Sequence, residues 1–255
     1  MSEMLRGRVA VVTGASAGIG RATSLALARE GMTVVLVARR GDRLEVVANE
    51  IAAAGGRALA YPADVADEDQ VQVLVAHVLD ELGRLDVMIC NAGFGIEGPI
   101  EAHTMTMMRR LMDVNYMGTF FAARAVLPIF RRAGHGHLIV VSSIAGRRGA
   151  PYVSGYAATK AAQIGLIEAL RAELAGSAIH VSGVYRCPST RSSRMSCEPP
   201  RARRRSRRAG RASLPRRLRR RSSAACAIRV RRSTRTRRPG CCRSSARWRH
   251  RSAIV

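Results

Sequence analysis

The sequence is almost free of lysine. Of its 43 Lys and Arg residues only Lys160 is a lysine, within the stretch SGYAATKAAQ. Aromatic residues are also scarce, at 4% of the chain, and residues 186–255 contain one Trp and no Phe or Tyr. This leaves few surfaces on which nucleic-acid bases could stack. All of the other Lys and Arg positions are occupied by arginine. The single lysine therefore indicates a specific task for Lys160.

Long apolar runs are missing too. No stretch approaches the roughly 18 consecutive apolar residues of a membrane helix. The segment from Met1 to Arg8 is not followed by the apolar stretch of a secretory signal. We therefore expect a cytoplasmic protein with no membrane partner.

Cysteine is used sparingly and shows no pattern of metal ligands. Before Tyr185 the only cysteine is Cys90. The other five, which have neither zinc-ligand spacing nor a disulfide context, are Cys187, Cys197, Cys226, Cys241 and Cys242. We expect no metal site.

Acidic residues disappear from the C-terminal part of the chain. Residues 1–185 contain 18 Lys and Arg against 17 Asp and Glu, whereas residues 186–255 contain 25 Arg and a single acid, Glu198. Almost all of the net charge of +25 therefore lies in the second part. Dense like charge with few apolar residues predicts a disordered Arg-rich tail over 186–255, after one folded domain over 1–185. Such a tail would bind polyanions without sequence preference.

The first part alternates short Val- and Ile-rich runs with longer stretches of helical period. This pattern is typical of βαβ units, and the continuous hydrophobicity of the runs fits strands covered on both faces. It predicts an α/β fold with a doubly wound (Rossmann) parallel sheet in a single domain. The expected strands are Val9 to Thr13, Thr33 to Ala38, Arg57 to Tyr61, Val87 to Cys90, His137 to Val141 and Ile179 to Tyr185. The expected helices are Ile19 to Glu30, Asp42 to Ala54, Asp67 to Leu82, Thr104 to Arg132 with a break near Asp113, and Tyr152 to Ala175.

A glycine-rich turn joins the first strand to the first helix. Its sequence, VVTGASAGIGRA, places Gly14, Gly18 and Gly20 at this junction. Backbone N–H groups at a helix N-terminus attract phosphate, and glycine lets the backbone come close to it. Together with Ser16 and Ile19, the turn is predicted to bind the pyrophosphate of a dinucleotide. A tight turn without a ligand is the alternative, which the position directly after the first strand disfavours.

Tyr156 and Lys160 stand four residues apart, so on a helix they occupy one face. A free phenol, with a pKa of about 10, is a poor base at neutral pH. A nearby ammonium favours the ionised phenol, and lysine offers a compact charge with three rotatable donors where arginine offers a rigid fork. The pair therefore predicts an acid–base site. A surface pair is the alternative for these two residues alone.

The spacing TGxxxGxG, from Thr13 to Gly20, resembles that of the short-chain dehydrogenase/reductase family. Two further motifs follow in the family's order. The sequence NAG at Asn91, Ala92 and Gly93 resembles the motif that supports the sheet beside the cofactor. Asp64 matches the acid that family members place near the adenine amino group.

The resemblance implies an oxidoreductase that transfers a hydride between a nicotinamide cofactor and a small carbonyl or alcohol substrate. Tyr156 would exchange a proton with the substrate oxygen, Ser143 would hold that oxygen, and Lys160 would also bind the cofactor ribose. Asn115 matches the asparagine that helps to hold a proton-relay water near the lysine. Ser142 is the less favoured neighbour of Ser143.

The end of the second strand indicates which dinucleotide binds. Ala38 stands where an NAD enzyme would place an acid for the ribose 2′-hydroxyl. Arg39 follows, and a guanidinium fork suits a 2′-phosphate. We therefore expect NADP rather than NAD. If Arg39 and Arg40 are only a solvated pair, the preference stays open.

The resemblance covers about Arg6 to Tyr185. Family members continue with a Pro-Gly turn, a lid over the substrate and a seventh strand, of which only Pro188 and Thr190 imitate a part. A GC-rich gene read out of frame yields Arg, Ala, Ser, Pro and Cys, so we interpret the tail as a frameshift product that impairs the enzyme. A selected basic extension is the alternative. The resemblance also implies homo-oligomers formed through the helices around 104–132 and 152–175.

A second function is a nucleotide-binding protein without turnover, whose Arg-rich tail binds nucleic acid through its phosphates. The presence of Ser143, Tyr156 and Lys160 together favours the enzyme. Binding alone does not require all three residues.

Overall fold

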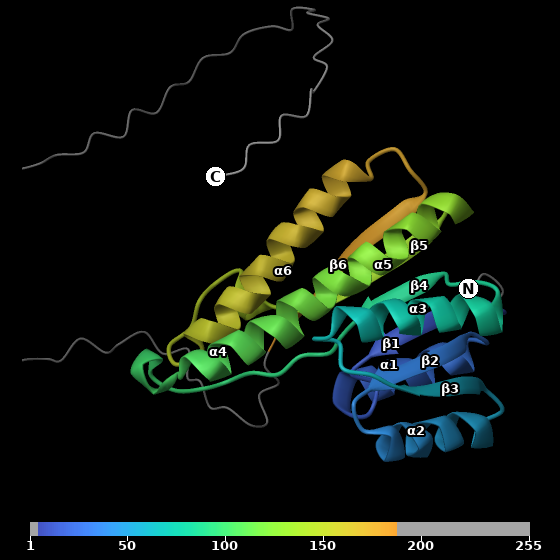
Figure 1. Ribbon diagram of the computed structural model, residues 1–255, viewed down its shortest axis with the longest axis horizontal. Helices are drawn as coiled ribbons and strands as arrows, with labels where there is room; N and C mark the ends of the chain where they lie inside the picture. Colours follow the sequence, from blue (N-terminus) through green and yellow to red (C-terminus); the bar gives the residue numbers. More distant parts are fainter. Residues whose placement is uncertain (1–4, 188–255) are drawn as a thin grey trace, which may run out of the picture. The chain divides into compact units, whose positions relative to one another are not determined.

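The computed structural model describes residues 5–187 (Figure 1). Residues 1–4 and 188–255 lie outside the described residues. This second range includes Pro188, Thr190 and nearly all of the predicted Arg-rich tail. The expected disorder of 186–255 therefore stays a prediction. Within residues 5–187, no helix is both long and apolar enough to span a bilayer.

Six parallel strands form one sheet in the order β3-β2-β1-β4-β5-β6. The strands are β1 (Val9–Thr13), β2 (Thr33–Ala38), β3 (Arg57–Pro62), β4 (Val87–Cys90), β5 (Gly136–Ser143) and β6 (Ile179–Arg186). The order reverses between β1 and β4, which is the doubly wound topology predicted from the sequence. All six predicted strands are confirmed, and β5 and β6 continue beyond their expected ends to Ser143 and Arg186.

Helices connect the strands in the expected places. They are α1 (Gly18–Arg29), α2 (Gly41–Ala53), α3 (Glu68–Leu82), α4 (Met105–Met112), α5 (Gly118–Ala133) and α6 (Ser154–Glu173), with short 3-10 turns η2 (Ile100–Ala102) and η4 (Ile144–Gly146). The break expected near Asp113 is a π-turn, η3 (Asp113–Met117), which joins α4 to α5. π-Turns inside helices frequently mark functional positions.

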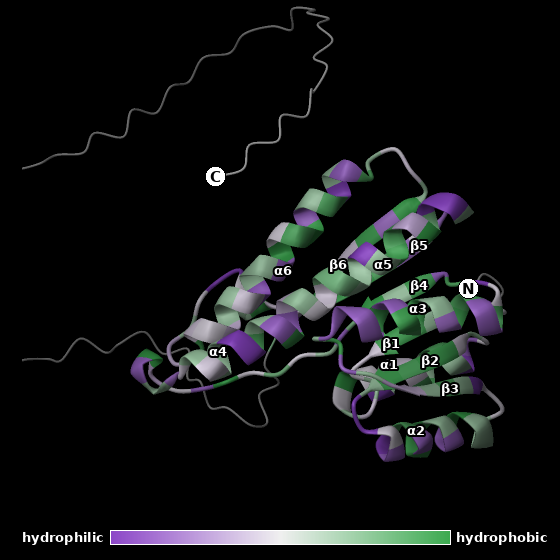
Figure 2. Ribbon diagram, in the orientation of Figure 1, coloured by the Kyte–Doolittle hydropathy of each residue, from purple (hydrophilic) through white to green (hydrophobic). Residues whose placement is uncertain are grey.

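The helices cover the two faces of the sheet unequally (Figure 1). Helices α3, α5 and α6 bury one face, with Phe130 and Ile167 fully enclosed. Helices α1 and α2 bury the other face over β1 and β2, where mixed hydrophilic and hydrophobic colouring shows their amphipathic character (Figure 2). On that second face Val184 of β6 is 48% exposed and Ile139 of β5 is only partly buried. Residues 5–187 therefore leave this part of the sheet open, although parallel sheets are normally covered on both faces.

The N-terminal ends of the two central strands, β1 and β4, are joined by Asp86, which directly precedes β4. Its carboxylate accepts hydrogen bonds from the Val9 backbone N–H (2.8 Å) and from the Arg84 guanidinium (2.9 and 2.7 Å). The Asp86 side chain is 1% exposed. Burial by itself raises the pKa of this carboxyl, but the bonds from Arg84 and Val9 outweigh burial and lower the pKa below its ordinary value of 3.8. The ionised side chain thus links β1 to β4.

Replacing Asp86 with Asn should destabilise the fold by about 1–3 kcal/mol at neutral pH, because bonds to a buried charge are lost. Since the folded-state pKa is lowered, the stabilisation is fully present above the unfolded pKa and is lost as the pH falls through the folded pKa. Urea unfolding from pH 7 to pH 3 should therefore show a smaller loss of stability in the variant than in the wild type.

Asp80→Asn serves as the control, because it removes an exposed carboxylate of α3. It should change the free energy of unfolding by less than about 0.5 kcal/mol. The same pH dependence in Asp86→Asn and in the wild type would contradict the role assigned to Asp86.

Candidate active site

The predicted site residues gather at the C-terminal ends of the parallel strands. Gly14 follows β1, Arg39 follows β2, Asp64 follows β3, Asn91 follows β4, and Ser143 ends β5. Doubly wound sheets bind ligands at this edge, next to the point where the strand order reverses. The strand order places that point between β1 and β4, beside the glycine-rich turn.

Gly14 in the turn after β1 and Gly20 in the first turn of α1 leave no room for a side chain. Gly14 has a φ of 67°, and a Cβ there would lie 2.9 Å from the Cα of Ala92. A Cβ at Gly20 would lie 2.6 Å from Nδ2 of Asn91 and closer still to the Gly14 carbonyl oxygen. The glycines therefore allow the turn to pack directly against the segment after β4.

The N-terminus of α1 has no side-chain cap. Its N-cap residue is Ala17, α1 begins at Gly18, and Ser16 lies just before it, partly buried. Ile19 in the first turn is 42% exposed. The N–H groups at the start of a helix need partners, and here no capping side chain supplies one. This arrangement suits an anionic ligand.

The NAG segment braces the glycine-rich turn. Nδ2 of Asn91 donates to the carbonyl oxygens of Thr13 (2.9 Å) and Gly14 (3.3 Å). In return, Oγ1 of Thr13 accepts from the backbone N–H groups of Asn91 and Ala92, both at 3.0 Å. The sequence motif begins at Thr13, but the role of its hydroxyl as an acceptor for the segment after β4 was not predicted.

Asp64 is engaged by a partner that the sequence did not reveal. Its Oδ2 accepts from Arg110 of α4 (2.6 Å) and its Oδ1 from the backbone N–H of Ala66 (3.1 Å). Burial alone raises the pKa of this carboxyl, but the Arg110 and Ala66 bonds and the nearby charge of Arg39 lower it overall. Arg39 is exposed, and none of the ion pairs found among residues 5–187 involves it.

The two serines at the end of β5 have different partners. Oγ of Ser142 donates to the Lys160 carbonyl oxygen (3.1 Å) and ties β5 to α6. Oγ of Ser143 accepts from the N–H of Ala145 (3.2 Å) and donates weakly to the Arg186 carbonyl oxygen (3.4 Å). The hydroxyl proton of Ser142 is thus held by α6 at 3.1 Å, whereas that of Ser143 is held only at 3.4 Å. Ser143 is therefore the better candidate for contact with a substrate.

Tyr156 and Lys160 lie on one face of α6, as their spacing predicted. The Lys160 Nζ lies 5.7 Å from the centroid of the Tyr156 ring. The ring also lies near Gly95, where a Cβ would be 3.5 Å from Cδ2 of Tyr156. Lys160 is 4% exposed, and its Nζ donates to the Val141 carbonyl oxygen at 3.0 Å. Lys160 is therefore buried and Tyr156 is partly buried, so the two do not form an exposed surface pair.

The surroundings of Lys160 disfavour its positive charge. Burial and, after it, the charge of Arg186 lower the pKa of Lys160 from 10.5 to about 8, against a small opposing effect of Cys90. Burial raises the pKa of the Cys90 thiol to about 12, so that group stays protonated at neutral pH. Lys160 is thus a cation that titrates near the physiological range.

Asn115 lies in the π-turn and is fully buried. Its Oδ1 accepts from the Phe94 N–H (3.0 Å), and its Nδ2 donates to the Phe94 carbonyl oxygen (2.9 Å) and to Oγ1 of Thr159 (3.0 Å). A Cβ at Gly93 would lie 2.9 Å from Asn115 Oδ1, so a side chain at Gly93 would collide with it. Asn115 therefore links the continuous helical stretch of α4, η3 and α5 to the segment after β4 and to α6.

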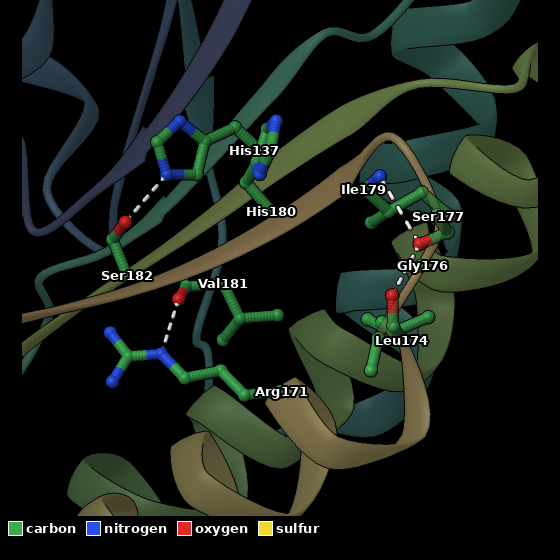
Figure 3. Close-up of a pocket in the computed structure, with 10 residues that line it drawn as sticks. His137, Arg171, Leu174, Gly176, Ser177, Ile179, His180, Val181 and Ser182 are labelled. Atoms are coloured by element: carbon green, nitrogen blue, oxygen red, sulfur yellow. Dashed lines mark hydrogen bonds between the residues drawn. The ribbon is translucent and has the colours of Figure 1, made fainter.

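A pocket of about 360 Å³ lies at the opposite, N-terminal end of β6 (Figure 3). Its lining includes His137, Arg171, Ser177, His180 and Ser182, and none of the predicted site residues. Two of these polar side chains, His137 and Arg171, have hydrogen-bond partners within the lining. His137 Nε2 lies 2.8 Å from Ser182 Oγ, and Arg171 Nε donates to the Val181 carbonyl oxygen at 2.7 Å. This pocket is therefore separate from the candidate active site.

Comparison with known proteins agrees with the geometry. The sequence profile of the family described as short chain dehydrogenase matches residues 8–199. The chain is 36% identical over 184 residues to the ketoacyl reductase HetN of Nostoc sp., which covers 72% of this chain and 63% of that protein. The chain thus spans less than two thirds of the length of this relative.

Solved structures show the same architecture. A metagenomic short-chain oxidoreductase in complex with NADP matches with a TM-score of 0.69 and 37% identity, over 72% of this chain and 83% of that one. A short-chain dehydrogenase/reductase from Burkholderia phymatum in complex with NAD matches with a TM-score of 0.68 and 31% identity, over 70% of this chain and 65% of that one. The resemblance seen in the motifs is confirmed, and the chain belongs to the short-chain dehydrogenase family.

Proposed function

We propose that the protein is an NADP(H)-dependent oxidoreductase that interconverts a small carbonyl compound and its alcohol. The observation that carries this proposal is the burial of Lys160, the only lysine in the chain, beside the ring of Tyr156. A desolvated ammonium next to a phenol favours the phenolate and so equips the phenol for proton transfer. A solvent-exposed pair would have no such effect.

The residues at the C-terminal edge fit a dinucleotide. The uncapped start of α1 at Gly18 offers N–H groups to a pyrophosphate, and Asn91 holds the turn that presents them. In the same proposal Asp64 binds the adenine amino group, and Ala92 and Gly93 line the cofactor beside the sheet. When bound, the nicotinamide supplies or accepts the hydride.

The chain's own residues then handle the proton and the substrate oxygen. Tyr156 donates its proton to the carbonyl oxygen in reduction and takes it back in oxidation, while Ser143 Oγ holds the same oxygen. Lys160 donates one N–H to Val141 and one to Gln163, and we assign its third N–H to the cofactor ribose. Asn115 keeps the long helix in place against α6.

A nucleotide-binding protein without turnover is not favoured, because the C-terminal end of β5, with Ser143, meets the N-terminal half of α6, with Tyr156 and Lys160. The name of one relative, a ketoacyl reductase, supports a carbonyl substrate. We also propose that the protein forms homo-oligomers through α5 and α6. We further propose that it acts in the cytoplasm.

The preference for NADP rests on the end of β2. Ala38 offers no acceptor to a ribose 2′-hydroxyl, and Arg39 is exposed beside it. One related structure holds NADP and another holds NAD, so family membership alone does not decide between the two. The choice therefore depends on Arg39 itself.

Arg39→Ala should raise the Kd for NADPH about 10- to 100-fold, because a charged hydrogen bond to phosphate contributes about 1.5–3 kcal/mol. The Kd for NADH should change little. Titration of nicotinamide fluorescence with both cofactors measures the two constants. Arg43→Ala, which removes an exposed charge from the first turn of α2, is the matched control and should leave both constants within about twofold. Equal affinities for NADPH and NADH in the unaltered protein would rule out the preference.

Tyr156→Phe should lower the rate of ketone reduction about 10²- to 10⁴-fold, because the proton donor is removed. The Kd for NADPH should stay nearly unchanged, since the lost hydroxyl acts on the substrate. Lys160→Arg should impair both activity and NADPH binding, because the lysine also bonds the ribose. Oxidation of NADPH by a β-ketoacyl thioester and a panel of small ketones gives the rates.

Tyr152→Phe is the control for this series, because Tyr152 is 63% exposed and lies just before α6. It should retain the activity of the unaltered protein. Turnover that survives in Tyr156→Phe would mean that another group donates the proton.

A further inference from the structure

Gln163 is a buried polar residue whose side chain accepts a hydrogen bond from Lys160 but has no chemical role of its own in the proposed mechanism. It lies on α6, three residues after Lys160, and is 0% exposed. Burying an amide away from water is unfavourable unless its polar atoms find partners. Two of the three partners of this amide, Lys160 and Asn115, belong to the candidate active site, and the third, Thr119, lies on α5.

The amide makes three hydrogen bonds. Its Oε1 accepts from the Lys160 Nζ at 3.0 Å. Its Nε2 donates to the Asn115 carbonyl oxygen at 2.7 Å and to Oγ1 of Thr119 at 2.8 Å. Thr119 Oγ1 in turn donates to the same Asn115 carbonyl oxygen at 2.9 Å. The amide nitrogen is thus bonded to acceptors of the π-turn and α5, and the amide oxygen to the ammonium.

The chemistry of the partners fixes the orientation of this amide. An ammonium is a donor only, and a carbonyl is an acceptor only. Rotating the amide by 180° would place its NH2 group against the Lys160 ammonium and its oxygen against the Asn115 carbonyl, so both contacts would be lost. The amide dipole therefore always presents its oxygen to Lys160.

Gln163 also joins Lys160 to the π-turn. In η3 the N–H of Gly118 bonds to the carbonyl of Asp113, five residues back, instead of the usual four. Within this shifted stretch, the Asn115 carbonyl accepts from the side chains of Thr119 and Gln163. A displacement of the π-turn would thus move the oxygen that holds the ammonium.

The other charged and titratable groups around Lys160 do not support its charge in this way. Arg186 on β6 repels it, and Cys90 on β4 is a buried thiol that stays protonated. Tyr156, which lies on α6 like Lys160, has its ring centroid 5.7 Å from the Lys160 Nζ. Among residues 5–187 no carboxylate is bonded to the Lys160 Nζ, and its two acceptors there are the Val141 carbonyl oxygen and Gln163 Oε1.

We propose that Gln163 is a positioning residue for Lys160, which holds the ammonium charged and aimed at Tyr156 and links it to the π-turn at Asn115. This proposal rests on the proposed function for its catalytic meaning, but the hydrogen bonds that carry it do not. Gln163 touches neither substrate nor cofactor in this scheme. It acts only through Lys160.

The single lysine makes a direct test feasible. The full chain, grown with lysine that carries ¹³C at Cε, gives one labelled side-chain signal, and its chemical shift against pH yields the pKa of Lys160. Gln163→Met keeps the length of the side chain but removes the acceptor. In that variant the pKa of Lys160 should fall by about one to two units, since the charged form loses a hydrogen bond. The alkaline limb of the pH profile for ketone reduction should shift to lower pH by the same number of units.

Two further variants separate positioning from a merely structural role. Thr159→Val also removes a buried hydrogen bond to Asn115 but none to Lys160, so it should leave the pKa of Lys160 within about 0.3 units of the unaltered protein. Gln163→Glu keeps an oxygen beside the ammonium, and the pKa of Lys160 should stay or rise. This variant still tests the proposal if Gln163→Met does not fold, because a fall of the pKa in Gln163→Glu would overturn it.

A pKa in folded Gln163→Met that equals the unaltered value would also overturn the proposal. If the lysine pKa shifts as expected but the unaltered protein does not oxidise NADPH with any ketone, the proposed function fails while the assignment of Gln163 stands. If the unaltered protein is active and the pKa does not move, the assignment fails while the proposed function stands.

Discussion

The burial of one ammonium, that of Lys160, constrains the end of the sheet that carries the candidate active site. Removing a charge from water costs several kcal/mol, which only well-placed hydrogen bonds offset. Lys160 finds two oxygens, one on β5 at Val141 and one on α6 at Gln163. Gln163 is in turn held by the π-turn through Asn115. Three elements must therefore stay in place for one charge to be tolerated, and this rigidity is what a proton-transfer site needs.

The same principle organises the rest of the sheet. At the N-terminal edge, the Asp86 carboxylate is buried and joins the start of β1 to β4. At the C-terminal edge, Thr13 and Asn91 exchange hydrogen bonds between the ends of the same two strands. In each case a polar group is satisfied by a partner on a different strand. The apolar core supplies most of the stability, and these pairs fix how the strand ends meet.

Much of the fold could be predicted because its signals are local. The six strands are short continuous apolar runs, and the glycine-rich segment from Gly14 to Gly20 follows the first of them. Tyr156 and Lys160 share a face because helical geometry places residues four apart on one side. These features require no knowledge of distant contacts. The family motifs then located Ser143 and Asn115 at the same edge.

The missed features depend on contacts between distant segments. Arg110 reaches Asp64 across 46 residues, and nothing near either position in the sequence indicates the pair. Gln163 stands in α6 like any polar helix residue until Asn115, 48 residues away, is packed against it. The break near Asp113 was expected, but its form as a π-turn depends on how the long helix packs.

The proposed function requires the C-terminal ends of the strands to bind a nicotinamide dinucleotide beside Lys160. Amide hydrogen exchange, followed by mass spectrometry on the full chain with and without saturating NADPH, tests it most directly. Binding at the proposed site should slow exchange in the turn at residues 14–20, in the segment 91–95 and at the start of α6. Unchanged exchange in all three segments at saturating NADPH, or protection confined to another part of the chain, would contradict the proposed function.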